Sequence, residues 1–155
     1  MEHTSFNMIE IDRHRSYKLY WIDFSESQKD LVLNRLDSLG LKILDIGFEL
    51  ASYLKEKSLN LALNNVPDYM NFLLDNHQNN DVQNNISFVI IKNIGFLLEP
   101  FLQIDAARLL KAYSKNIGVI LLWDGNVRDN SMLYWQNEPD YQINFSETKI
   151  NKIEI

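Results

Sequence analysis

The chain has 155 residues, a formal net charge of −6 at pH 7 and no cysteine. Its hydrophobic share of 46% and charged share of 23% are those of an ordinary globular protein, so we expect one domain over residues 1–155. The absence of cysteine excludes disulfides and thiolate metal sites, and the acidic balance argues against direct binding of a nucleic-acid backbone.

Residues 1–16 are expected to form a solvated amino-terminal arm, in which Arg13, His14 and Arg15 lie close together. No basic stretch followed by an apolar run opens the chain, and the longest apolar runs are far shorter than the roughly 20 residues of a membrane span. We therefore expect a cytoplasmic protein that does not contact membranes.

The first half of the chain alternates strand and helix patterns. A strand is predicted over 17–22, ending at Asp23, and a second over 41–44, ending at Asp45. Between them, Ser25 and Gln28 have the spacing of a capping box, and Gly40 is expected to end the helix. Helical segments follow around 50–57 and from Pro67 onward, and in the second of these Tyr69, Phe72 and Leu73 are expected to form the apolar stripe. Residues 76–86 are rich in asparagine and are expected to form a polar surface loop.

The second half holds the two most apolar segments. Residues 87–91 and 118–123 are apolar at nearly every position, which is typical of strands buried on both faces of a parallel sheet. Asp105 is placed to cap a helix between them. The segments 132–135 and 141–145 alternate and predict a short antiparallel extension. The whole pattern predicts an α/β fold: a three-layer αβα arrangement with a mostly parallel sheet.

Ligands of such sheets bind outside the carboxyl ends of the strands, where a phosphate-binding loop would follow the first strand. The segment from Asp23 to Asp30 has Lys29 in register with the lysine of the motif G-x-x-x-x-G-K-[ST]. Asp23 and Gln28 stand in place of its glycines, and Asp30 in place of its hydroxyl residue. Carboxylates here oppose a triphosphate, so Lys29 is a weak candidate for nucleotide binding.

The second half of a nucleotide-hydrolysing site is an acidic residue after an apolar strand, which orients Mg²⁺. Lys92 stands at this position, directly after residues 87–91. We expect Lys92 to bridge to Asp23 or Asp45. The loss of both motifs predicts a P-loop NTPase-like core that does not hydrolyse nucleotide, although the question of enzymatic activity stays open.

Residues 97–145 resemble a known family. The sequences LLEPFLQID at 97–105, SKN at 114–116, WDG at 123–125 and EPDY at 138–141 are similar to the small P-loop protein (BrxF-like) of type 3 BREX phage-defence systems. The resemblance implies a P-loop fold and a place in anti-phage defence. Its nucleotide chemistry does not transfer, because the glycines and the metal-binding acid are absent here.

Three functions follow from these observations. The first is a non-catalytic adaptor subunit of a defence complex, bound to other subunits such as a larger ATPase, with no cofactor. Its candidate contact residues are aromatic, as at many interfaces: Trp123, Tyr134, Trp135 and Tyr141. The second is a Mg²⁺-dependent phosphoryl-transfer enzyme or nuclease using Asp23, Asp45 and Asp124. The third is binding of ATP without hydrolysis. The oligomeric state is left open.

Overall fold

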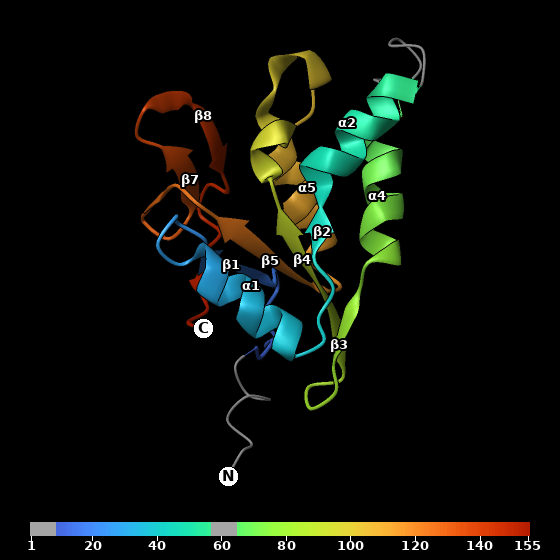
Figure 1. The fold of residues 1–155 in the computed structure, drawn as a ribbon, viewed down its shortest axis with the longest axis vertical. Coiled ribbons are helices and arrows are strands. Elements are labelled where there is room, and N and C mark those ends of the chain that lie inside the picture. The colour runs from blue at the N-terminus through green and yellow to red at the C-terminus, as the bar shows by residue number, and fades with distance from the viewer. Residues whose placement is uncertain (1–8, 57–64) are drawn as a thin grey trace.

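The computed structural model describes residues 9–56 and 65–155, and these form a six-stranded sheet with helices on both faces (Figure 1). Five of the strands are parallel. In spatial order they are β2 (Leu44–Asp45), β4 (Ile86–Lys92), β5 (Gly118–Trp123), β1 (Leu19–Asp23) and β9 (Asn151–Lys152). The helices are α1 (Lys29–Ser38), α2 (Ile46–Glu56), α4 (Val66–Asn76) and α5 (Ala106–Tyr113), with 3-10 helices η2 (Ile94–Leu98) and η3 (Pro100–Leu102).

The two central strands, β4 and β5, are buried because their side chains are apolar on both faces. Val89 lies beside Val119 in the register, and both pack toward the same core. Ile90 and Ile120 lie beside each other and pack toward the opposite face. The sheet therefore separates two hydrophobic cores, as the run of apolar residues in each strand predicts.

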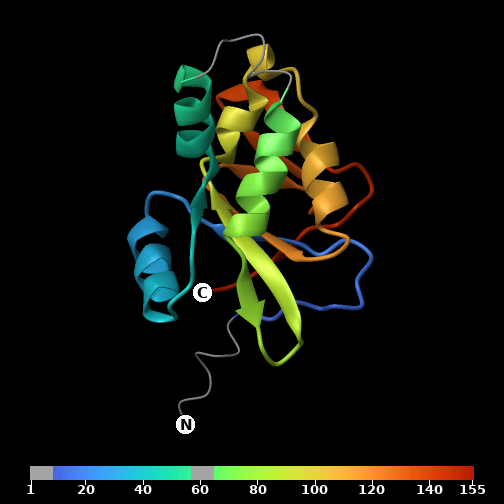
Figure 2. The same ribbon diagram turned by 90° about the vertical axis from the view of Figure 1, so that its right-hand side faces the viewer.

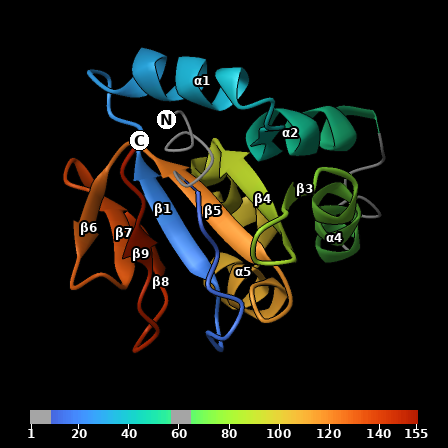
Figure 3. The same ribbon diagram turned by 90° about the horizontal axis from the view of Figure 1, so that it is seen from below.

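Helices α2, α4 and α5 cover one face of the sheet (Figure 2). Helix α1 covers the other face, so that α1 and α5 lie on opposite sides of β1, β5 and β4 (Figure 3). Ile9 and Ile11 also pack into the core on the α1 side. The prediction of a solvated arm over 1–16 is therefore wrong for 9–11, since these isoleucines cover apolar surface that α1 leaves open. Residues 1–8 of that arm lie outside the described residues.

Helix ends follow the sequence signals in two of three cases. Gly40 has φ +70, and the amide of Leu41 donates to the carbonyl of Leu36, so α1 ends as predicted. Asp105 caps α5 by accepting the Arg108 amide at 3.1 Å. The capping box at Ser25 is wrong: the cap position of α1 is Gln28, which makes no side-chain capping bond.

The apolar stripe of α4 also differs from the prediction. Met70, Leu73 and Leu74 are buried, whereas Phe72 is 58% exposed. Tyr69 and Phe72 instead stack with each other on the surface, with ring centroids 6.0 Å apart. The helix is rotated so that its most compact aliphatic side chains fill the space over the sheet.

The predicted polar loop over 76–86 is partly wrong. It contains β3 (Asn79–Asp81), which pairs antiparallel with the first half of β4, while β2 pairs with the second half. Asn79 is buried. Its side-chain oxygen accepts a hydrogen bond from the Lys42 amide at 2.8 Å, and its side-chain NH₂ donates one to the Lys42 carbonyl at 3.0 Å. The asparagine-rich segment forms a strand here because β4 offers backbone partners to it, and Asn79 in turn supplies partners for the backbone groups of Lys42.

The carboxyl-terminal third forms a second, three-stranded antiparallel sheet of β6 (Asn126–Arg128), β7 (Met132–Trp135) and β8 (Glu138–Asn144). The chain then returns to add β9 beside β1. The predicted parallel sheet with an antiparallel extension is confirmed. Among the described residues, no helix has both the length and the hydropathy needed to cross a membrane.

Candidate functional site

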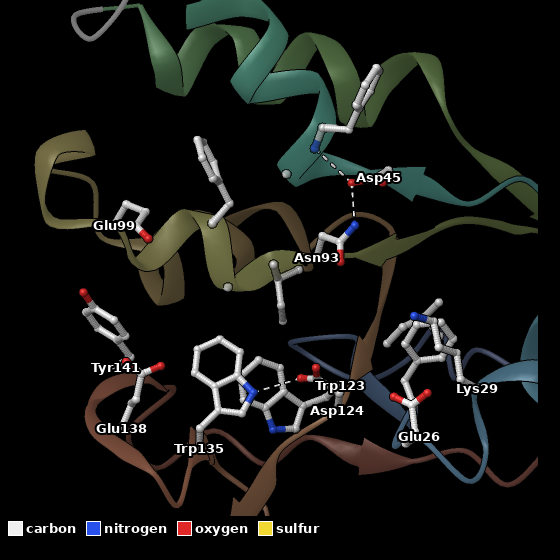
Figure 4. Close-up of a pocket in the computed structure, with 17 residues that line it drawn as sticks. Glu26, Lys29, Asp45, Asn93, Glu99, Trp123, Asp124, Trp135, Glu138 and Tyr141 are labelled. Atoms are coloured by element: carbon white, nitrogen blue, oxygen red, sulfur yellow. Dashed lines mark hydrogen bonds between the residues drawn. The ribbon is translucent and has the colours of Figure 1, made fainter.

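A cavity of about 800 Å³ lies at the carboxyl ends of β1, β2, β4 and β5 (Figure 4). This is the edge of a parallel sheet at which α/β proteins bind ligands. Helix α2, helix η2 and strands β7 and β8 supply the remaining walls. The lining residues are Phe24, Glu26, Lys29, Asp45, Gly47, Phe48, Asn93, Ile94, Gly95, Phe96, Glu99, Leu122, Trp123, Asp124, Trp135, Glu138 and Tyr141.

One wall is built around Asp45. Its Oδ1 accepts hydrogen bonds from the Phe48 amide and from the Asn93 side chain, each at 2.9 Å. The first bond caps α2, and the second ties that helix to the end of β4. Asn93 adopts φ +60, a conformation that asparagine tolerates better than most residues, and it turns the chain from β4 into η2. Asp45 is thus held in place by neutral donors.

The floor of this cavity is formed by two tryptophan side chains, those of Trp123 and Trp135. The ring centroids of Trp123 and Trp135 are 4.7 Å apart, and the indole N–H of Trp135 donates to Asp124 Oδ1 at 2.9 Å. Trp123 is buried and donates to the Asn126 carbonyl at 2.9 Å. The antiparallel sheet therefore inserts an aromatic side chain from β7 beside the end of β5.

The cavity is acidic. Its carboxylate residues are Glu26, Asp45, Glu99, Asp124 and Glu138, against the single cation Lys29. Figure 4 shows Glu99 and Glu138 at one end, with Tyr141, and Glu26 and Lys29 at the other. At an effective dielectric constant of 20, two like charges 4 Å apart repel by about 4 kcal/mol, so this lining disfavours phosphates and favours cations.

The predicted phosphate loop is closed by its own hydrogen bonds. The Asp23 carboxylate accepts the Ser25 amide at 2.9 Å. The amides of Gln28 and Lys29 both donate to the Ser25 carbonyl, also at 2.9 Å. A phosphate cradle requires backbone amides that point outward without partners, and these amides already have acceptors.

Lys29 lies at the rim of the cavity as an exposed side chain. Its ammonium is 5.7 Å from the centroid of the Phe24 ring. Within the described residues, no carboxylate lies within ion-pair distance of it. Lys29 remains the weak candidate that the sequence predicts, now set among acidic neighbours.

Of the three carboxylates predicted to bind a metal, Asp45 and Asp124 line the cavity, whereas Asp23 does not. Asp45 ends β2 and Asp23 ends β1, and β4 and β5 lie between these strands. Strands lie about 4.8 Å apart, so the two backbones are separated by roughly 14 Å. In the described part of the chain, no three histidine or acidic side chains are grouped as a metal site.

Lys92 does not bridge these carboxylates as the sequence predicts. It lies beside Asp45 in the register, but Asp45 bonds Phe48 and Asn93 instead. Lys92 does not line the cavity, and no ion pair of its side chain occurs among the described residues. The prediction was wrong because Asn93, the next residue, turns into the position beside Asp45.

The predicted aromatic contact residues fall into two groups. Trp123, Trp135 and Tyr141 line the cavity. Tyr134 lies outside it, with its ring 4.8 Å from the Arg128 guanidinium carbon. Sequence reasoning missed Glu99 and Glu138, which reach the cavity only through the fold and share no spacing motif.

Searches against protein-family models and against curated proteins gave no match. The functional argument therefore depends on the fold and on the chemistry of the cavity.

Proposed function

We propose that this chain is a non-catalytic, P-loop-like adaptor that binds a basic segment of a partner protein in its acidic cavity. The observation that carries the proposal is the lining, with carboxylates on Glu26, Asp45, Glu99, Asp124 and Glu138 around an aromatic floor. A guanidinium or ammonium group gains both from the carboxylates and from the face of a tryptophan. The same lining disfavours a nucleotide.

The P-loop-like part of the proposal is supported by the sheet. The sheet is mostly parallel and its strands alternate with helices, an arrangement that α/β nucleotide-binding folds share. Lys29 begins the helix after β1, as the lysine of a phosphate loop does. The closed amides after β1 and the lysine after β4 support the absence of catalysis.

The setting is supported by the resemblance of residues 97–145 to a small P-loop protein of type 3 BREX systems. On that basis we propose that the partner is another subunit of an anti-phage defence complex, such as a larger ATPase. An adaptor needs a cavity that recognises its partner but no catalytic residues. This agrees with a cavity at the strand ends that lacks the residues for nucleotide hydrolysis.

The expected affinity is moderate. Each exposed ion pair contributes about 0–1 kcal/mol, and a cation against an exposed aromatic ring about 0.5–1 kcal/mol. Several such contacts are required for stable binding, so the partner segment should carry more than one basic residue. Because salt screens these charges, we expect binding to weaken as the salt concentration rises.

The test is affinity capture from the native host with two charge-matched variants. The double variant Glu99→Gln/Glu138→Gln removes two cavity charges. The control Asp30→Asn/Asp37→Asn removes two charges from α1, away from the cavity lining. We expect the wild type and the control to retain one defined partner and the cavity variant to lose it. Recovery of the chain alone, or equal capture by both variants, would contradict the proposal.

A further inference from the structure

A second cavity, of about 510 Å³, lies along α5 near the amino ends of β1 and β5. Tyr17 comes just before β1 and Lys115 just before β5, so this cavity and the acidic one lie at opposite ends of the same strands. Arg108 and Lys111 on α5 supply one wall, and Asn144 at the end of β8 and Ser146 beyond it supply another. Its volume is within the range of small-molecule sites.

The charge of this cavity is positive. Arg108, Lys111 and Lys115 line it, against the single carboxylate of Asp105. That carboxylate already accepts the Arg108 amide as the cap of α5. Across residues 9–56 and 65–155, none of the three cations forms an ion pair. The cavity therefore has positive charge without a protein counter-charge.

Two of these cations are held near the same ring. The ammonium of Lys111 is 4.7 Å, and that of Lys115 is 5.8 Å, from the centroid of the Tyr17 ring. Each contact with the ring is favourable, but the two ammonium groups repel each other. An anion close to both would relieve that repulsion, so the arrangement is suited to receive one.

A buried cation adds to the positive potential. Lys18 is only 6% exposed, and its ammonium donates to the carbonyls of Arg15 and Lys115 at 2.9 and 2.8 Å. These acceptors are neutral, so the charge of Lys18 is not cancelled by a carboxylate in the described part of the chain. The ammonium of Lys18 is therefore bonded to the backbone of a residue that lines the cavity.

We infer that this cavity binds a phosphate or pyrophosphate group of a small molecule. The cavity has three cations, which is more than a ligand with a single carboxylate would need for charge balance. An anion with two or more charges matches them better. The guanidinium of Arg108 has the planar donor geometry that suits phosphate oxygens. The amide of Asn144 and the hydroxyl of Ser146 add neutral donors. This inference is independent of the adaptor proposal, because it concerns different residues at the other end of the sheet.

The test is calorimetric titration of the folded full chain with pyrophosphate and with inorganic phosphate at low ionic strength. Lys111→Gln and Arg108→Gln should each weaken pyrophosphate binding by about tenfold or more, since each removes a charged hydrogen-bonding group. Lys111→Arg should keep most of the affinity. The control Lys55→Gln removes an exposed lysine at the end of α2 and should bind as the wild type does.

Four results would overturn the inference. The first is the absence of binding at millimolar phosphate and pyrophosphate by the wild type. The second is binding that Lys111→Gln and Arg108→Gln leave unchanged. The third is binding that Lys29→Gln abolishes instead, which would place the phosphate in the acidic cavity. Binding of a single-stranded oligonucleotide without binding of pyrophosphate would also contradict it, because it would assign the cations to a nucleic-acid backbone.

Discussion

Trp135 lies between two glycines and a carboxylate. A Cβ atom on Gly95 would lie 2.3 Å from Cη2 of this ring, and one on Gly125 would lie 2.7 Å from Cδ1. The ring also donates to Asp124. Glycine is needed at both positions because the indole fills the space that a methyl group would take. The floor of the acidic cavity therefore depends on residues that lie 30 positions apart in the chain.

Gly95→Ala tests this packing. The new methyl group would lie too close to the indole, so the Trp135 ring must shift from its place beside Asp124. We expect a loss of about 1–3 kcal/mol in the free energy of unfolding, measured by urea denaturation, together with a change in tryptophan fluorescence. An unchanged spectrum and unchanged stability would show that Trp135 does not lie against Gly95.

Gly40→Ala is the matched control for glycine loss. No atom lies within 4 Å of a Cβ built on Gly40, but its φ of +70 is unfavourable for alanine. We expect a loss of about 1–2 kcal/mol from backbone strain alone, with no change in tryptophan fluorescence.

Tyr113 on α5 gives the stability of the protein a dependence on alkaline pH. Burial, followed by a hydrogen bond to Asp75, raises the pKa of Tyr113 from 10.0 to about 12, while a hydrogen bond from Gln78 acts in the opposite direction. The unfolded chain releases this proton near pH 10, and the folded chain keeps it to about pH 12. The stabilisation is therefore complete below pH 10 and is lost as the pH rises toward 12.

Tyr113→Phe should make the unfolding free energy less dependent on pH between pH 10 and 12. Urea denaturation at a series of pH values checks this. A residual dependence is expected from Tyr69, whose pKa is raised by burial and by the carboxylate of Glu49. If the variant and the wild type have the same slope, the pKa of Tyr113 is not raised by the fold.

At the scale of elements, β3 pairs with β4 through its backbone and is tied to the segment before β2 by the side chain of Asn79. Asn79 satisfies both backbone groups of Lys42, which joins β3 to the segment before β2. Asn79→Ala should cost about 1–2 kcal/mol in urea denaturation, because it leaves those groups to solvent and removes a buried side chain. Asn80→Ala is the control: Asn80 is exposed and accepts one bond from Ser87. Equal effects of the two substitutions would contradict this role of Asn79.

Helices and strands were predictable from the sequence where the apolar residues of the segment itself determine that it is buried. Strands β4 and β5 are apolar along nearly their whole length, and β5 matches its predicted bounds at 118–123. Strands β3, β6 and β9 have two or three residues and are largely polar, so they form only because a neighbour offers free backbone groups. The stripe of α4 was only partly predicted: Tyr69 and Phe72 have the same i, i+3 spacing as the buried pair Met70 and Leu73, so periodicity alone did not show which pair faces the core.

The candidate site was predictable in position and only partly in composition. The rule that ligands bind at the carboxyl ends of parallel strands located Asp45 and Asp124 from the sequence. Glu99 and Glu138 lie on a connecting loop and on the antiparallel sheet, and no local pattern places them beside those strand ends. Their contribution depends on how the second sheet packs against η2, which is a property of tertiary structure.

For the whole molecule, the central feature is the opposite charge at the two ends of the sheet. The cavity at the carboxyl ends is lined by carboxylates, and the cavity near the amino ends by Arg108, Lys111 and Lys115. The net charge of −6 conceals this separation. This charge separation is the basis of our two proposals, that a basic segment binds at the first end and a phosphate at the second.

The central claim, that the acidic cavity takes a cation, is tested most directly by tryptophan fluorescence during titration with a short arginine-rich peptide. Trp123 and Trp135 form the cavity floor and report on its occupancy. We predict a saturable change with the basic peptide at low salt, no change with an acidic peptide of equal length, and a reduced change in Glu99→Gln/Glu138→Gln. The absence of a response to the basic peptide, with a response to Mg²⁺–ATP that Lys29→Gln abolishes, would contradict the claim.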